Sequence, residues 1–415
     1  MKIVGTTVFI AMLSINTHSD EIGTSTEWES LSYLEGTSPE TLQQVQLDLT
    51  LDTSVMQQRV HIDGSVRRAN KASLKDHQLL REGYLDAVVF DQDIRIGQQT
   101  IRWGRSDIVS ALDFSRRNFQ DPLDNDNEDL GSLAVALKQY KVDSTVEVVV
   151  LPTYQYSLMP TLESPWFARL PPKTGANQSI RYTLADLDRP SLAFSNTQYG
   201  ARVNAFFSGW DLGISYFNGW NDAPRYRSEI TAFNENTVDV RITPFTHRIQ
   251  ILGGDFAANM ELGTLRGEIS YIDTKDRKGN NPDIDDPYFH LIFGADYVLS
   301  DAIENQDLNI LVEYSKQFKT TSIEYTATDF DHIFQDAVSV RLNLDVEPVW
   351  ALTVDYIQDL RNTGQFIRPN IRYRFNDQLS FDFMAEWLDG ESSSFFGYYK
   401  GNRALRLRVT YDSLF

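Results

Sequence analysis

The sequence predicts an all-β protein, a transmembrane antiparallel up-and-down β-barrel of about 16 strands, within a range of about 14 to 18. One observation is the C-terminal segment, in which apolar and polar residues alternate from Leu405 to Asp412 before the chain ends on Phe415. A period of two indicates a strand with one apolar and one polar face. A second observation is that similar segments of about ten residues recur along the chain, the length that a tilted membrane strand requires.

The composition is compatible with this class. The chain has 415 residues, a formal net charge of -20 and no cysteine. The acidic balance argues against a nucleic-acid partner, which would need a basic surface. A mean hydropathy of -0.35 also suits a barrel, because the face turned toward the lumen is polar.

The N-terminal residues have the pattern of a secretion signal. Lys2 precedes a mostly apolar run from Ile3 to Ile15, and small residues follow before Asp20. We expect residues 1–19 to be a signal peptide, with a buried N-terminal strand as the alternative. Residues 20–56 are expected to be a periplasmic or lumenal lead-in. The alternation from Gln44 to Thr53 is strand-like, but one additional strand would make the strand number odd.

The barrel is expected to occupy residues 57–415. Each predicted strand has an apolar parity for lipid and a polar parity for the lumen. The sixteen segments are 58–67, 79–90, 93–103, 132–141, 144–151, 197–208, 210–218, 247–258, 262–272, 288–299, 306–317, 336–347, 349–358, 366–375, 378–388 and 402–412.

The lengths of the connections between the predicted strands independently indicate a barrel. Tight turns alternate with long polar loops at 104–131, 152–196, 219–246, 273–287, 318–335 and 389–401. Barrels of this class have short periplasmic turns and long outer loops. We therefore expect the outer membrane of a Gram-negative bacterium, with outer-membrane lipid and lipopolysaccharide as partners.

The inward parity carries both signs of charge, and arginine is prominent in it. Arginine suits carboxylates and phosphates, so these residues are candidates for lining a pore that prefers anions. The alternative is that opposed Arg and Asp or Glu side chains neutralise each other across the strands. The candidates are Arg95, Arg102, Arg202, Arg266, Arg341, Arg372, Arg374, Arg406, Arg408, Glu268, Asp345 and Asp382.

The most distinctive segment is 79–123. It resembles a family of porin-like Gram-negative outer-membrane barrels, known mainly as a domain of unknown function, that share a WGxxD motif and are distantly similar to alginate-export-type channels. The resemblance implies a channel, sometimes associated with envelope lipid export, and implies no catalytic residue. This chain departs from the family pattern at Gly83 and at Arg105-Ser106. The matching residues are Arg81, Glu82, Tyr84, Leu85, Asp86, Arg95, Gly97, Gln99, Trp103, Gly104, Asp107, Asp113, Arg117 and Asp121.

Two long loops are candidates for narrowing the pore. In the motif loop, Trp103, Gly104, Asp107, Asp113, Arg117 and Asp121 come with further arginines, and such a network could fold the loop inward. The alternative is a pinned outer loop. In the loop 152–196, prolines accompany Trp166, Phe167 and Arg169. A loop of this length is usually ordered for a reason, so we expect a constriction, or else a lid on the rim.

The sequence favours neither an enzyme nor a metal protein, and no cofactor is expected. His61 and Ser65 would lie roughly 13 Å apart along one strand, too far for a catalytic pair. The acidic runs at 124–129 and 283–286 fail the EF-hand pattern. The expected function is a porin-like channel for passive or facilitated passage of a polar or anionic solute. The alternatives are an export channel for an acidic exopolysaccharide or envelope lipid coupled to an inner-membrane pump, and a structural or adhesive surface barrel.

Overall fold

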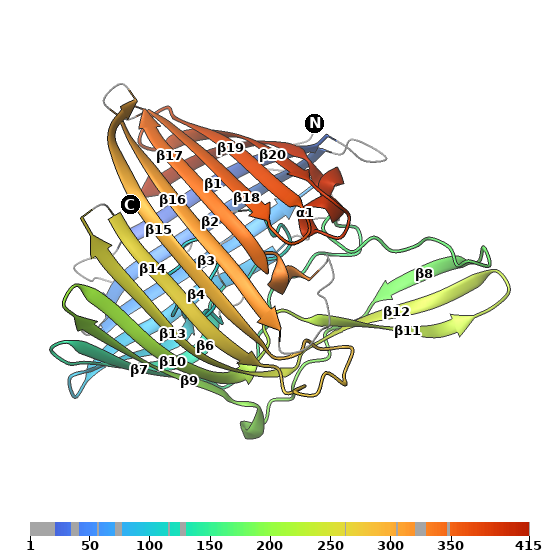
Figure 1. Cartoon of the computed structure of the whole chain (residues 1–415), viewed down its shortest axis with the longest axis horizontal. Helices are drawn as coiled ribbons and strands as arrows, with labels where there is room; N and C mark the ends of the chain where they lie inside the picture. The colour runs from blue at the N-terminus through green and yellow to red at the C-terminus, as the bar shows by residue number, and fades with distance from the viewer. Residues whose placement is uncertain are drawn as a thin grey trace.

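The fold is a closed barrel of eighteen antiparallel strands with a separate three-stranded sheet projecting from one end (Figure 1). A computed structural model provides the coordinates. It describes residues 21–34, 41–55, 58–70, 77–114, 117–124, 130–261, 263–303, 306–319, 329–346 and 349–414. The expected signal peptide and the terminal Phe415 lie outside these residues. Within them, no helix has the length and apolar character needed to cross a membrane.

The barrel strands are 8 to 16 residues long. They are β1 (Glu21–Tyr33), β2 (Thr41–Val55), β3 (Gln58–Ala69), β4 (His77–Val89), β5 (Gln92–Gln99), β6 (Ser132–Tyr140), β7 (Ser144–Leu151), β9 (Gln198–Phe207), β10 (Trp210–Trp220), β13 (Arg248–Met260), β14 (Gly263–Asp273), β15 (Tyr288–Ile303), β16 (Gln306–Lys319), β17 (Asp336–Val346), β18 (Trp350–Asp359), β19 (Gly364–Arg374), β20 (Leu379–Asp389) and β21 (Ala404–Leu414).

The remaining elements lie in the loops. They are β8 (Ser179–Leu184), β11 (Arg225–Phe233), β12 (Thr237–Phe245), the 3₁₀ turns η1 (Phe194–Asn196), η2 (Phe330–His332) and η3 (Lys400–Asn402), and the short helix α1 (Phe395–Tyr398).

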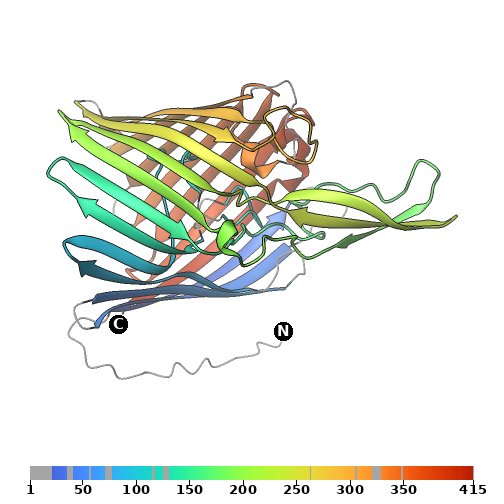
Figure 2. The same cartoon turned by 90° about the horizontal axis from the view of Figure 1, so that it is seen from below.

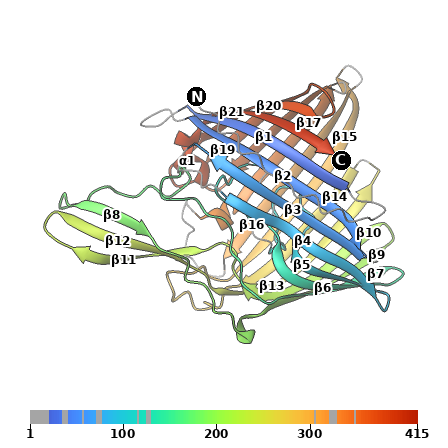
Figure 3. The ribbon, with the colours of Figure 1, turned by 180° about the vertical axis from the view of Figure 1, so that it is seen from behind.

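The first and last strands close the barrel. β1 pairs with β21 from Gly23 opposite Leu414 to Tyr33 opposite Ala404, and with β2 on its other side. Figure 3 shows this seam, with β1, β2 and β21 side by side. Because the ring of strands is complete, it leaves no unpaired edge in the hydrocarbon, where an unpaired backbone group would cost several kcal/mol.

The sequence interpretation of residues 20–56 as a lead-in is wrong, because these residues supply β1 and β2. The sequence argument excluded one extra strand because it would make the strand number odd. Two extra strands keep the number even and are compatible with that argument. The signal was weak for a physical reason. Four of the six outward positions of β1 hold Ser or Thr, with Ile22 and Trp28 at the other two, while Leu31 and Tyr33 face inward and are buried. The sixteen predicted segments correspond to the other barrel strands, although β5 ends at Gln99, so Trp103 lies beyond it.

The two-residue rhythm separates the faces of the wall. In β6, Ala134 and Ala136 are buried inside the barrel, whereas Leu133 and Val135 are 40% and 42% exposed on the outside. The same alternation recurs in β9 and β19. The outward side chains form an apolar band suited to lipid.

Long connections gather at one end of the barrel, here called the loop end, and short turns at the other, the turn end (Figure 2). β8, β12 and β11 make the sheet that projects from the loop end, with β8 parallel to β12. Their residues were predicted to be loop. The barrel strands meet across these insertions, with β7 beside β9 and β10 beside β13.

Candidate solute channel

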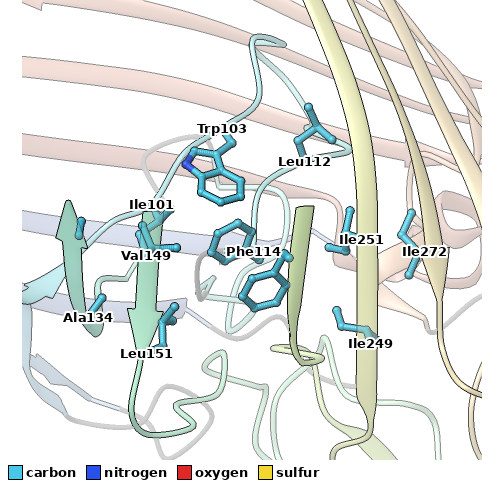
Figure 4. Close-up of a cluster of buried hydrophobic side chains, with 12 residues drawn as sticks. Ile101, Trp103, Leu112, Phe114, Ala134, Val149, Leu151, Ile249, Ile251 and Ile272 are labelled. Atoms are coloured by element: carbon cyan, nitrogen blue, oxygen red, sulfur yellow. The ribbon is translucent and has the colours of Figure 1, made fainter. Parts of the chain in front are cut away.

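The connection between β5 and β6, residues 100–131, turns back into the barrel and is called the inward loop. Its apolar side chains Trp103, Leu112 and Phe114 are buried to 2%, 1% and 6% exposure. The ring of Phe114 lies edge-on to Trp103 at 4.8 Å and stacks on Phe217 of β10 at 3.9 Å. Figure 4 shows this cluster between the loop and the wall.

The wall beneath the inward loop is apolar, although inward positions were expected to be polar. Val149, Phe217, Ile251 and Ile272 all face inward and are buried in this cluster. Burying apolar surface on both partners stabilises the docked loop at about 25 cal/mol per Å². The loop therefore covers an apolar sector of the inner wall and leaves a polar sector open.

Two buried wall carboxylates hold the middle of the loop. Glu268 of β14 accepts hydrogen bonds from the backbone N–H groups of Arg105 (2.5 Å), Ser106 (2.7 Å) and Ala111 (2.8 Å), and from the Ser110 hydroxyl (2.9 Å). Glu313 of β16 accepts from the N–H groups of Asp107 (2.7 Å) and Ile108 (3.0 Å). Charge-assisted bonds of this kind are about twice as strong as neutral ones.

The WGxxD residues lie at the start of this anchor. Asp113 accepts hydrogen bonds from the N–H groups of Trp103 (2.7 Å) and Gly104 (2.8 Å), so the loop closes on itself. A Cβ at Gly104 would collide with the Ser110 side chain, which explains the glycine.

Ion pairs fix the same region to the wall. Arg105 reaches Asp255 (2.5 Å) and Asp211 (2.8 Å), and Asp107 pairs with Arg266. These ion pairs join the loop to the wall; they do not run between the arginines and aspartates of the loop itself.

A second anchor lies at the far end of the inward loop, against the closing seam. Arg406 of β21 pairs with Glu29 of β1 (3.0 Å), Asp121 (2.5 Å) and Asp124 (3.0 Å). Arg408 pairs with Glu29 (2.9 Å) and Asp124 (3.3 Å). These residues are called the seam cluster, and both of its arginines are only 3% exposed.

Neighbouring groups extend the seam cluster. Arg368 of β19 donates to the carbonyl of Leu123 (2.5 Å) and pairs with Asp355 (3.1 Å). Burial acts to raise the pKa of Asp124, but the nearby guanidinium groups of Arg406, Arg408 and Arg368 outweigh it and lower the pKa to about 2. Asp124 is therefore ionised at neutral pH and holds the loop by charge.

Cavities remain on the polar side of the inward loop. One of about 360 Å³ lies between the loop and the wall of β17, β18 and β19, where Arg341, Asp355 and Ile357 face it. A second of about 640 Å³ lies toward the turn end, with Arg95, Lys138 and Glu147 in its lining. Arg102 lines both cavities, so they adjoin at this side chain.

Arg117 lines the first cavity and also a smaller one of about 120 Å³ nearer the loop end. Within the part of the chain that the structure describes, no hydrogen bond or ion pair engages its guanidinium. Three of the five carboxylates that line the first cavity, in contrast, form ion pairs with the wall. Asp107, Asp124 and Asp355 are each paired with an arginine of the wall. Arg117 is therefore a positive group whose charge no ion pair in the described structure offsets.

The structure places the predicted pore residues in three settings. Arg202, Arg406, Arg408, Glu268 and Asp382 face inward but are buried at or below 5% exposure, in contact with the loop or the wall. Arg266 is also engaged, with Asp107 and Asp296. Arg95, Arg102 and Arg341 line the cavities. Arg372, Arg374 and Asp345 lie near the turn end, where Arg372 pairs with Asp382 at 2.8 Å.

The predicted constriction residues of the loop 152–196 lie at the loop end. Trp166 is 2% exposed and packs on Phe395 and Tyr399 of the β20–β21 connection. Phe167 lies edge-on to Tyr226, and the backbone N–H of Arg169 donates to the Tyr398 hydroxyl (2.7 Å). Trp166 also lines a small cavity with Glu29, Asp121 and Arg406. Trp166 therefore lies over the seam cluster on the side of the loop end. This position is intermediate between the predicted constriction in the pore and the alternative, a lid on the rim.

Several anchoring residues were missing from the candidate set. Glu29 was overlooked because its strand was taken for a lead-in. Glu313 and Arg368 occupy inward positions of strands that were predicted, beside Val312 and Ile367 on the lipid side. The parity of those strands was therefore sufficient to find both.

The two acidic runs of the sequence are residues 124–129 and 283–286. Most of 124–129 lies outside the described residues. Asp283 pairs with Arg227 (3.0 Å). Asp285 pairs with Arg225, and its carboxylate lies 3.0 Å from Nε2 of His332. These contacts tie the base of the projecting sheet to the loops β14–β15 and β16–β17. No group of three or more potential metal ligands is found among the described residues.

Comparison with solved structures shows that the fold is shared with known outer-membrane proteins. The sequence matches no family model, and no curated protein matches it. OccAB4 from Acinetobacter baumannii superimposes with a TM-score of 0.52 at 11% identity, covering 96% of this chain and 99% of that one. OccK2 (OpdF) from Pseudomonas aeruginosa, solved in complex with glucuronate, gives 0.51 at 11%, covering 95% and 96%.

A third match comes from a protein described differently. Wzi from Escherichia coli, an outer-membrane protein involved in group 1 capsule assembly and a carbohydrate-binding β-barrel, gives a TM-score of 0.51 at 12% identity, covering 94% of this chain and 83% of that one. At these identities the likeness concerns the fold alone. The chain has the architecture of Gram-negative outer-membrane porins.

Proposed function

We propose that the protein is an outer-membrane channel for a small anionic or polar solute, which passes between the inward loop and the wall of β17, β18 and β19. The observation that carries this proposal is the row of cavities on the polar side of the loop. The two larger cavities adjoin at Arg102, and Arg117 lines the first of them together with a smaller cavity that borders the apolar cluster at Ile249 and Ile251. A solute moving along this row meets both guanidinium groups.

The charge pattern supports an anion. Near Arg117, Asp124 and Asp355 are already paired with wall arginines, whereas the Arg117 guanidinium has no partner among the described residues. A planar fork of donors binds carboxylate or phosphate in two-point contact. A solute anion can therefore bind there without displacing an existing ion pair.

The size of the passage supports a small solute. The inward loop is held at Glu268 and Glu313 on one side and at the seam cluster on the other, so it crosses the lumen between two fixed points. A polymer threaded through the barrel would require the loop to leave at least one of them.

The test is planar-bilayer recording of the refolded protein in a potassium chloride gradient. We expect a reversal potential that indicates anion preference, and a reduction of this preference in Arg117→Ala. The control is Arg374→Ala, which removes an equal charge at the exposed turn end. Glucuronate, the ligand of OccK2, should block the wild-type current more than that of Arg117→Ala. A wild-type channel with a clear cation preference would refute the anion proposal.

An export channel for an acidic polysaccharide or envelope lipid is the second candidate, which the resemblance of the 79–123 motif and the shared fold with Wzi support. An acidic oligosaccharide would then block the current more strongly than monomeric glucuronate. A structural or adhesive barrel would show no stable conductance. The pump that the export candidate requires would be an inner-membrane protein.

A further inference from the structure

A short apolar segment lies on the outside of the barrel, at the junction between the projecting sheet and β9. Leu192 is 86% exposed and Phe194, at the start of η1, is 94% exposed. In Figure 1 this segment is the small green helical turn that protrudes below β9 and β10. It is independent of the channel, which is built from inward-facing groups.

Hydrogen bonds fix this segment to the outer surface of the wall. The indole N–H of Trp220 donates to the carbonyl of Asn196 (3.3 Å), and Arg248 donates to the carbonyl of Ser195 (2.6 Å). Trp220 and Arg248 are paired opposite each other on β10 and β13, on the same parity as the exposed Leu212 and Leu252. That parity faces lipid.

The height of the segment follows from the length of β9. Its ten residues span about 33 Å along the strand and about 25 Å across the membrane after a tilt of about 40°, which matches the apolar band of such barrels. Phe207 marks the turn-end edge of this band, and Gln198 marks the loop-end edge. Residues 191–196 therefore lie at the outer boundary between hydrocarbon and headgroups.

The neighbouring side chains have the chemistry of that boundary. The rings of Tyr199 and Tyr216 lie 6.4 Å apart, and the Arg248 guanidinium lies 4.6 Å above the Trp220 ring. Aromatic rings of this kind concentrate at the headgroup level. The exposed apolar residues continue this surface outward from the lipid-facing wall.

We propose that residues 191–196 are a membrane anchor, in which Leu192 and Phe194 insert into the acyl chains of the outer leaflet. The anchor also fixes the projecting sheet, because the preceding residues are bound to it: the N–H of Ala185 donates to Ile242 (2.8 Å) and that of Asp188 to Pro244 (2.8 Å). The angle of the sheet to the membrane is then set by the lipid contact.

The chain has no cysteine, so a single introduced cysteine can carry a nitroxide label at one known position. We would label Leu192→Cys and Phe194→Cys in protein reconstituted into liposomes and compare collisions with oxygen, which partitions into lipid, and with a water-soluble nickel chelate. Val203→Cys, on the lipid face of β9, is the lipid control. Gly175→Cys, where an added Cβ meets nothing within 4 Å, is the water control.

The proposal predicts an oxygen-to-nickel collision ratio several-fold above that of Gly175→Cys and close to that of Val203→Cys. A ratio equal to the water control would overturn it. Low collision rates with both reagents would also overturn it, since they would mean that a protein surface covers the segment.

Discussion

Glu268→Ala should release the middle of the inward loop. The substitution removes the acceptor of four hydrogen bonds, three from backbone N–H groups and one from Ser110. Each bond to a charged group contributes about 1.5–3 kcal/mol when its donor stays buried, but a lifted loop can rehydrate its donors, so about 1 kcal/mol each is appropriate. The sum is about 4 kcal/mol, which raises the undocked fraction about 10³-fold.

The measurement is single-channel recording together with limited proteolysis of the loop. We expect a larger and noisier conductance and new cleavage between residues 104 and 111. Glu268→Gln keeps one acceptor oxygen and should have a smaller effect. Asp345→Asn removes the same charge near the turn end, away from the loop, and should leave cleavage unchanged. If Glu268→Ala has the conductance and protease resistance of the wild type, Glu268 does not hold the loop.

Three further predictions concern the other contacts of the loop. Arg406→Ala leaves the buried carboxylates of Glu29 and Glu386 without this partner, so it should cost about 3–5 kcal/mol; a thermal unfolding midpoint equal to that of the wild type would contradict this. Trp103→Ala opens a cavity at a side chain that is 2% exposed and should cost about 3–5 kcal/mol, measured by the same unfolding experiment, with Trp350→Ala on the lipid face as the matched control. The pKa of Asp124 falls from 3.8 to about 2 on folding. Its stabilising contribution is therefore complete above about pH 4 and is lost as the pH falls toward 2, so loop proteolysis should be equal at pH 8 and pH 4.5; increased cleavage at pH 4.5 would show that Asp124 is not the charge that holds the loop.

The wall of the barrel was predictable because lipid imposes a rule on every second residue. The sixteen segments with apolar outward positions were all found. β1 was not predicted because four of its six outward positions carry Ser or Thr, which weakens the apolar alternation that a hydropathy pattern detects. The projecting sheet was not predicted because β8, β11 and β12 lie outside the membrane. There, no lipid contact requires an apolar residue at every second position.

The direction of an inward side chain was also predictable, but its partner was not. Arg406 and Arg408 were correctly placed on the inner face, yet their partners come from residues 29 and 121–124, hundreds of positions away in sequence. Periodicity along one strand carries no information on which loop will fill the lumen beside it. The motif loop gave a partial signal, since its mixture of Arg and Asp indicated a network without naming Glu268 or Glu313.

The seam cluster has a consequence for the order of biogenesis. Its carboxylates come from the first strand and from the β5–β6 connection, and its guanidinium groups come from the last strand. Asp124 therefore gains its ion-pair partners Arg406 and Arg408 only after the last strand, β21, is in place. A partly inserted barrel would expose the loop to periplasmic proteases, and resistance to cleavage would mark the molecules whose insertion is finished.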